Sequence, residues 1–447
     1  MPFIPTTDAN RKEMLKTIGV EKFEELLQSI PKEARFKGKL DLPEPLSEYE
    51  VSKLLKSIAQ KNEHTGTHVC FLGGGAYDHF VPAAIDHILL RSEFYTAYTP
   101  YQPEVAQGNL QAIYEYQTMI ANLTAMDVAN ASMYDGASAL AEAALLTQAH
   151  TKREEILISK TVHPYHRQVV NTYCHRSGIK LKEIELEDGI TSITKLKQMV
   201  NDKTAGLLVQ HPNFMGNLEE VEEMEQIIHK AGGLYVVSVD PISLGTLKPP
   251  GEYGADVATG EGQVFGNSLS FGGPYVGIFA VKQPLIRRLP GRLAGVTVDS
   301  KDRRGFVLTL QTREQHIRRE KATSAICTNE QLCALASTIY LALMGKEGLP
   351  TVSNLSLQKA HYLADNLLKV KGVKRCYQRP FFKEFAICCP VPPKKVIAGM
   401  RKEKIFAGID LSRFDYGMKD GLLIAVTEKR TKEEMDRYVE VFKKIVS

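Results

Sequence analysis

The chain has 447 residues, 43% of them hydrophobic and 24% charged, a composition typical of a soluble globular protein with a sizeable core. Its formal net charge of +4 is too small to indicate binding to nucleic acid or an anionic membrane, and no long apolar run indicates a membrane span. The first twenty residues lack an apolar block and the seven cysteines lack regular spacing, so we expect reduced thiols and a cytoplasmic location.

The first 65 residues are predicted to form an N-terminal arm and a helix. Ser47 fits the start of a capping box. The apolar residues that follow recur at helical spacing: Val51, Leu54, Leu55 and Ile58. The rest of the chain is predicted to divide into a large α/β domain (66–325), a connecting helix (326–350) and a small α+β domain (351–447).

A glycine run, Gly73 to Gly75, opens the large domain. A dinucleotide-binding G-x-G-x-x-G frame starting at Gly73 would need a third glycine where the chain has Asp78. We therefore expect a loop whose backbone closely approaches another group.

The segment 98–104 contains two prolines and two tyrosines and few charges. A rigid aromatic loop of this kind suits a pocket lid or a subunit contact better than a solvent loop. Its candidate contact residues are Tyr98, Thr99, Tyr101, Gln102 and Glu104.

Beyond residue 154 strand-like and helical patterns alternate. The expected strands are 156–159, 179–186, 205–210 and 234–240, and the expected helices lie near 167–175, 193–200 and 221–231. This alternation predicts a mainly parallel sheet covered on both faces, with ligands bound beyond the carboxyl ends of the strands.

Several residues near these strand ends are candidates for a pocket. Gly136, Ala137 and Ser138 open an alanine-rich helix whose free N–H groups suit a phosphate, although such small residues equally suit close packing on a sheet. His163 faces a cofactor-like pocket or belongs to a strand-to-helix turn. Asp240 ends a strand, as catalytic acids and turn-forming acids both do.

No lysine occurs between Lys248 and Lys282. There a strand, a short loop with Gln263 and a Gly-Gly-Pro turn follow Asp240, an order that resembles the pyridoxal-phosphate (PLP) enzymes of the aspartate-aminotransferase fold. The resemblance implies that an acid meets the pyridine nitrogen and that a loop lysine binds PLP covalently. Gln263 stands where that lysine is expected, and an amide nitrogen cannot form the linkage. The predicted pocket is therefore vestigial, and consists of Gly136, Ala137, Ser138, His163, Asp240 and Gln263.

A basic cluster follows over 313–321, either as a solvated helix face with Glu314 and Glu320 as partners or as an anion site across a subunit interface. Its candidate contact residues are Arg318, Arg319, Lys321, Thr323 and Ser324. Thr328 then fits a capping box for an apolar helix that should end at Gly345.

Three segments carry a more specific resemblance. The runs Ala-Tyr-Thr-Pro-Tyr-Gln-Pro-Glu-Val-Ala-Gln-Gly (97–108), Ala-Asn-Ala-Ser-Met-Tyr-Asp-Gly (129–136) and 308–324 resemble the P-protein of the glycine cleavage system. Nearly the whole chain is similar to the alpha chain of its two-chain form. The resemblance implies a glycine dehydrogenase (decarboxylating) activity, which releases CO2 from glycine and transfers the aminomethyl group to the lipoyl arm of H-protein.

The same resemblance implies that the alpha and beta chains have different roles in the enzyme. PLP would be bound covalently by the beta chain (subunit 2) in an α2β2 heterotetramer with functional links to T-protein and L-protein. The segments 98–104 and 318–324 would border the beta chain's site or its lipoyl channel. Two alternatives remain: a catalytically dead scaffold or regulatory subunit, and a self-sufficient PLP enzyme that uses Lys248 or Lys282. Asp78 contradicts a nucleotide-dependent oxidoreductase.

Overall fold

The computed structural model describes residues 5–322, 324–326 and 328–447, which form two compact units, 1–63 and 64–447. The first unit contains two helices and two short 3-10 segments: α1 (Asp8–Ile18), Phe23–Leu27, Lys32–Ala34 and α2 (Glu48–Ala59). The predicted capping box is confirmed, because the Ser47 hydroxyl accepts from the Glu50 amide while the Glu50 carboxylate accepts from the Ser47 amide. Neither helix has a buried residue.

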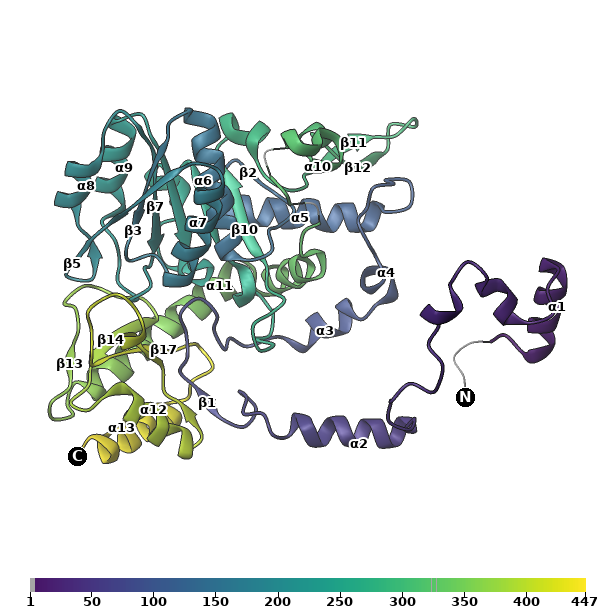
Figure 1. Ribbon diagram of the computed structural model, residues 1–447. Helices are drawn as coiled ribbons and strands as arrows, with labels where there is room; N and C mark the ends of the chain where they lie inside the picture. The colour runs from purple at the N-terminus through teal and green to yellow at the C-terminus, as the bar shows by residue number, and fades with distance from the viewer. Residues whose placement is uncertain (1–4, 323, 327) are drawn as a thin grey trace. The chain divides into compact units, whose positions relative to one another are not determined.

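A seven-stranded sheet forms the centre of the second unit (Figure 1). Its order is β2 (Val128–Ala129), β10 (Gly277–Val281), β9 (Val257–Glu261), β8 (Leu234–Val239), β7 (Thr204–His211), β3 (Glu155–Ser159) and β4 (Lys180–Ile184). The five strands from β9 to β4 are parallel, and β10 runs antiparallel to its two neighbours. The predicted strands and their mainly parallel arrangement are confirmed.

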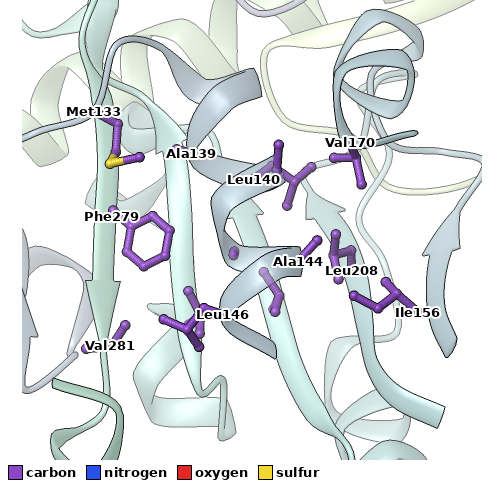
Figure 2. Packing of buried hydrophobic residues seen from close by; sticks show 14 of the residues in the cluster. Met133, Ala139, Leu140, Ala144, Leu146, Ile156, Val170, Leu208, Phe279 and Val281 are labelled. Atoms are coloured by element: carbon purple, nitrogen blue, oxygen red, sulfur yellow. The ribbon is translucent and has the colours of Figure 1, made fainter. Parts of the chain in front are cut away.

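Helices cover both faces of this sheet. On one face α6 (Gly136–Thr151) and α7 (Pro164–Arg176) pack Leu140, Ala144 and Val170 against strand residues such as Leu208 and Phe279 (Figure 2). On the other face the buried residues of α8 (Ile193–Met199) and α9 (Val221–Lys230) meet the alternate strand residues. Alternate strand residues face opposite sides of a sheet, so both sets are apolar in a sheet buried on both faces.

A four-stranded antiparallel sheet forms near the C-terminus. Its order is β13 (Lys374–Arg375), β14 (Glu384–Cys388), β17 (Gly421–Ala425) and β16 (Ile409–Asp410). The helices α12 (Pro393–Lys402) and α13 (Lys432–Val446) share its apolar core through Val396, Met400 and Phe442. The boundaries predicted for this domain stay predictions.

The long helix α11 (Gln331–Leu367) corrects one expectation and confirms another. It begins after Glu330 without a side-chain cap, so the capping box predicted at Thr328 is wrong; Asn329 instead donates to the main-chain oxygen of Ala131. The apolar helix does stop at Gly345, as predicted, because the non-helical backbone there (φ 57°) separates it from a second helix that runs to Leu367. Among the described helices α11 has the length and composition of a membrane span, but this break leaves no segment of about 20 continuous apolar residues.

Smaller elements complete the described part of the second unit. They are α3 (Ala83–Leu89), α4 (Ser92–Tyr95), α5 (Gln107–Thr124), α10 (Gln315–Arg318), the pair β1 (Val69–Cys70) and β15 (Ile405–Phe406), the hairpin β5 (Leu186–Glu187) and β6 (Ile190–Thr191), and the hairpin β11 (Ala294–Val298) and β12 (Arg304–Leu308).

Candidate functional site

A small cavity lies beyond the carboxyl ends of the central strands. His163 after β3, Gln210 in β7, Asp240 after β8 and Glu261 at the end of β9 contribute to its wall. The structure therefore brings together two of the predicted pocket residues, His163 and Asp240. The cavity measures about 30 Å³, room for about two water molecules, whereas ligand sites usually exceed about 300 Å³.

His163 belongs to the strand-to-helix turn and also contributes to the wall of the small cavity. Its ring lines the cavity, and its Nδ1 also accepts from the Tyr165 amide at the start of α7 (3.1 Å). It stacks on His166 with ring centroids 4.6 Å apart. Burial lowers the pKa of His163 to about 3, so this ring is neutral.

The glycine run approaches the C-terminal sheet closely, as the sequence predicts. A side chain at Gly73 would collide with the Glu384 carboxyl group and with Ala425, and the Gly74 amide donates to Glu384 Oε1 (2.7 Å). The Tyr77 hydroxyl donates to Glu384 Oε2 (2.6 Å), and burial raises the pKa of Glu384 to about 7. The glycines thus bring the chain against its own side chains.

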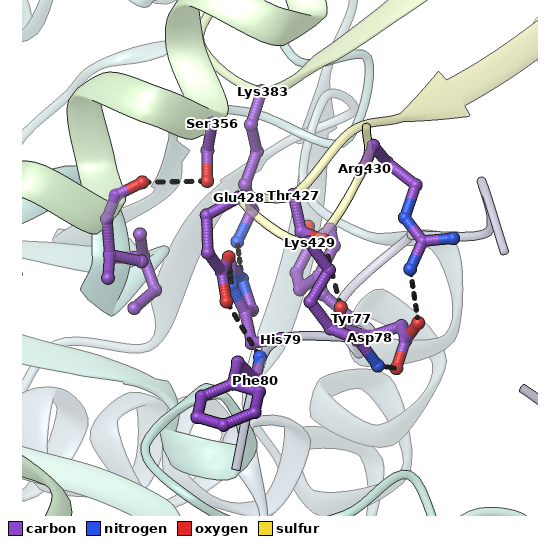
Figure 3. Close-up of polar contacts among 12 residues, drawn as sticks. Tyr77, Asp78, His79, Phe80, Ser356, Lys383, Thr427, Glu428, Lys429 and Arg430 are labelled. Atoms are coloured by element: carbon purple, nitrogen blue, oxygen red, sulfur yellow. Dashed lines mark hydrogen bonds and ion pairs between the residues drawn. The ribbon is translucent and has the colours of Figure 1, made fainter. Parts of the chain in front are cut away.

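The residues after the glycine run are fixed by the loop that follows β17 (Figure 3). Asp78 pairs with Lys429 (2.6 Å) and Arg430 (3.0 Å). His79 Nδ1 lies 2.5 Å from Glu428 Oε2. Burial, and the nearby ammonium of a lysine, lower the pKa of His79, so its neutral ring donates from Nδ1 to this carboxylate.

That lysine, Lys383, occupies the position beside Asp240. Its Nζ lies 2.8 Å from Asp240 Oδ2, 3.0 Å from His79 Nε2 and 3.6 Å from the centre of the Tyr77 ring. Lys383 is only 1% exposed. The other carboxylate oxygen of Asp240 accepts from the Ile242 amide (3.1 Å), so the turn-forming interpretation also holds. The acid that would meet a pyridine nitrogen is thus paired with a cation of the chain itself.

The start of α6 is likewise occupied. The Gly136 amide donates to Glu261 Oε2 (2.9 Å), and the Ser138 amide donates to Asp135 Oδ1 (2.7 Å). The other oxygen of Glu261 accepts from the amides of Gln263 (3.0 Å) and Val276 (3.2 Å). Burial outweighs these hydrogen bonds and raises the pKa of Glu261 to about 8.

These contacts bear on the phosphate site predicted at Gly136, Ala137 and Ser138. The N–H groups of Gly136 and Ser138 already donate to carboxyl groups of the chain. A phosphate would have to displace both, so the interpretation of this helix start as a remnant is favoured over an open anion site.

Gln263 is buried in a 3-10 turn after β9, but its amide is directed at the glycine-rich loop. Its Oε1 accepts from the Tyr77 amide (2.9 Å), and its Nε2 donates to the Tyr77 (3.2 Å) and Asn267 (2.6 Å) main-chain oxygens. The side chain therefore fixes the main chain of Tyr77, whose ring lines the cavity. The replacement of a lysine by Gln263 stays a prediction.

The two alternative lysines lie elsewhere. Lys248 Nζ pairs with Glu222 (2.9 Å), and Lys282 Nζ donates to the Ala125 main-chain oxygen (3.1 Å). The buried Lys383 pairs with Asp240 at 2.8 Å.

The cavity does not fit a PLP molecule. Its volume holds water only, its acid is paired with Lys383, and its helix start is capped by Glu261 and Asp135. Three residues at or beside the cavity were not predicted from the sequence as site residues: Lys383, Glu261 and Tyr77. The adjacent charges Lys383 and Glu384 inside an apolar strand pattern were the available signal for the first of them.

The aromatic segment 98–104 contacts Arg292 and His316 through Tyr101. The Tyr101 hydroxyl accepts from Arg292 Nη2 (2.8 Å), and its ring lies edge-on to His316, with centroids 5.8 Å apart. Tyr101 is 45% exposed and Tyr98 79% exposed. Gln102 and Glu104 are also exposed, and Thr99 is half-buried.

The basic cluster is divided between structural and exposed residues. Arg313 donates to the main-chain oxygens of Leu310 (3.0 Å) and Gly291 (3.1 Å), and Glu314 is buried, so these two residues do not belong to a solvated face. Burial raises the pKa of Glu314. The remaining candidates divide as follows: Arg318, Arg319 and Lys321 are exposed, Ser324 is half-buried, and Thr323 lies outside the described residues.

Comparisons with known proteins agree over the full length. The glycine cleavage system P-protein family matches residues 1–442. A probable glycine dehydrogenase (decarboxylating) subunit 1 from Chloroherpeton thalassium is 56% identical over 445 residues, which cover 100% of this chain and 100% of the relative. A crystal structure of glycine decarboxylase (P-protein) of the glycine cleavage system, in inhibitor-bound form, is 44% identical, with a TM-score of 0.93 and 100% of both chains covered.

A sphingosine-1-phosphate lyase from Burkholderia pseudomallei shares the fold alone. It is 14% identical, with a TM-score of 0.68 over 93% of this chain and 94% of the lyase. Together these likenesses confirm the predicted α/β fold of PLP-dependent transferases, with a mixed main sheet and a small C-terminal sheet.

Proposed function

Since the chain belongs to the glycine cleavage system P-protein family, we propose that it is the alpha chain of a two-chain enzyme and holds no PLP itself. The observation that supports this proposal is that the chain's own side chains occupy the space around the small cavity, where PLP would otherwise bind. Lys383 pairs with Asp240, Glu261 accepts from the start of α6, and the Tyr77 ring lies against Lys383 and lines the cavity.

The cofactor is then covalently bound by the partner beta chain, subunit 2, in an α2β2 heterotetramer. PLP supplies the electron sink that makes loss of CO2 from glycine possible. The aminomethyl group passes to the lipoyl arm of H-protein, and T-protein and L-protein act on the products. The chain works in the cytoplasm. The "subunit 1" in the relatives' name supports the existence of such a partner.

The contribution of this chain is an exposed surface around Tyr101. Arg292 donates to the Tyr101 hydroxyl and His316 packs against its ring, so the Tyr101 side chain is held in place in a largely exposed segment. An aromatic loop beside the exposed cations Arg318, Arg319 and Lys321 suits a site that receives anionic groups. We infer that this surface borders the beta chain's site or its lipoyl channel.

A second candidate function is a scaffold that contributes no residue to catalysis. The contacts of the acidic residues around the cavity favour it, because Asp240, Glu384 and Glu261 each bind another group of the chain itself. The two candidates differ in the effect of substitutions at the exposed loop, which alter activity only if the loop borders the reacting groups.

Co-expression tests the proposal. The chain is produced with and without a candidate beta subunit, and glycine-dependent CO2 exchange is measured with lipoylated H-protein. We expect exchange only in the mixture. Exchange by the single chain, together with an absorption band of a PLP–lysine imine near the edge of the visible range that borohydride abolishes, would establish a self-sufficient PLP enzyme instead.

A further inference from the structure

The first unit has no hydrophobic core. None of the residues 5–63 is buried, and fourteen large hydrophobic side chains, from Met14 to Ile58, are exposed by 39% or more. Soluble proteins rarely leave so many large apolar side chains uncovered within one short segment.

The helix α2 concentrates this apolar character on one face. Val51, Leu54, Leu55 and Ile58 form a stripe at helical spacing and are each 39–59% exposed. An isolated helix of 12 residues is marginally stable in water, so α2 requires a surface on which the stripe can pack.

The size and charge of the unit indicate what kind of surface this is. At about 60–120 Å² for each large apolar side chain, the fourteen expose on the order of 1,000 Å², comparable with the roughly 800 Å² that one partner buries in a stable interface. Residues 1–63 contain eleven basic and eleven acidic side chains, so charge does not favour nucleic acid or an anionic membrane. The complementary surface is an apolar protein surface.

We propose that residues 5–63 form a docking arm that packs the α2 stripe onto the second chain of the P-protein. The proposal rests on the proposed function, since the partner is the beta chain. The family match begins at residue 1, and relatives named subunit 1 align over 98–100% of the chain, so the arm belongs to the module that acts with another subunit. The arm contributes affinity for the partner and no reacting group.

Substitutions on opposite faces of α2 test the arm in the full-length chain. Leu54→Gln with Leu55→Gln alters the stripe, whereas Lys53→Gln with Lys56→Gln introduces the same residue on the opposite face as a matched control. Association with the beta chain is measured by analytical ultracentrifugation, and hydrogen exchange of the amides of 48–59 is measured with and without the beta chain. Circular dichroism checks folding of each variant.

The expected result is a loss of affinity of at least tenfold for the Leu54 and Leu55 variant and less than twofold for the control. The amides of α2 should become protected only when the beta chain is added. Equal affinities of the two variants would overturn the proposal, as would protection of α2 in the single chain, whether by its own second unit or in a dimer of this chain. Failure of the unmodified chain to bind the beta chain would instead count against the proposed function.

Discussion

Replacement of Lys383 by methionine tests whether the buried ion pair between Lys383 and Asp240 stabilises the folded chain. Lys383 Nζ lies 2.8 Å from Asp240 Oδ2 and 3.0 Å from His79 Nε2. Methionine keeps most of the apolar stem and removes the ammonium. The Asp240 carboxylate is then left in a largely buried position without its cation.

The cost follows from the burial of the pair. Removal of one partner of a buried ion pair destabilises a protein by about 3–5 kcal/mol, because the other charge stays desolvated. Unfolding entropy of about 2.1 cal/mol/K per residue gives about 0.8 kcal/mol/K for a unit of roughly 400 residues, so the thermal midpoint should fall by about 4–6 °C. Addition of Asp240→Asn removes the orphaned charge and should restore a large part of this loss.

The assay is thermal unfolding, followed by circular dichroism, of both single variants and the double variant. Lys429→Met is the control, because Lys429 is 31% exposed and Asp78 keeps its contact with Arg430; we expect a loss of less than about 1 kcal/mol. The reasoning is refuted if Lys383→Met shifts the midpoint no more than Lys429→Met. It is also refuted if the effects at Lys383 and Asp240 simply add, since coupled residues deviate from additivity.

Three further predictions address the helix start, the glycine run and the exposed loop. The pKa of Glu261 is raised to about 8, so the folded chain holds a proton that the unfolded chain releases, and the free energy of unfolding falls as pH rises from about 5 to 8. In urea unfolding, Glu261→Gln should remove about 1.4 kcal/mol per pH unit of this dependence. An unchanged pH dependence in the variant would contradict the raised pKa. Gly73→Ala should destabilise the chain by about 1–3 kcal/mol through overpacking, whereas Gly108→Ala, with open space in α5, should be neutral or stabilising; equal thermal midpoints would count against the close approach. Tyr101→Phe removes the acceptor of the Arg292 hydrogen bond and should lower glycine decarboxylation several-fold in the assembled enzyme with association unchanged; wild-type kinetics would favour the scaffold.

The fold was accessible from the sequence because its signals are local. The parallel strands are short apolar runs between helical patterns, and the cap at Ser47 forms as its residue spacing indicates. The helix stop at Gly345 could also be predicted, because glycine readily takes the positive-φ backbone conformation that interrupts a helix.

The residues around the cavity could be predicted only in part from the sequence. His163 and Asp240 were found because they follow strands whose ends meet at one edge of the sheet. Lys383 is separated from Asp240 by more than a hundred residues and immediately precedes β14 of the small C-terminal sheet, so local spacing carries no information about their contact. The direction of the Gln263 amide likewise depends on Tyr77, which belongs to a distant loop.

Borohydride reduction of the assembled enzyme, followed by peptide mapping, shows directly which of the two chains binds PLP covalently. The reduced pyridoxyl group should be recovered on a lysine of the second chain, and the peptides of this chain, including the one that contains Lys383, should be unlabelled. A pyridoxyl label on any lysine of this chain would contradict the account.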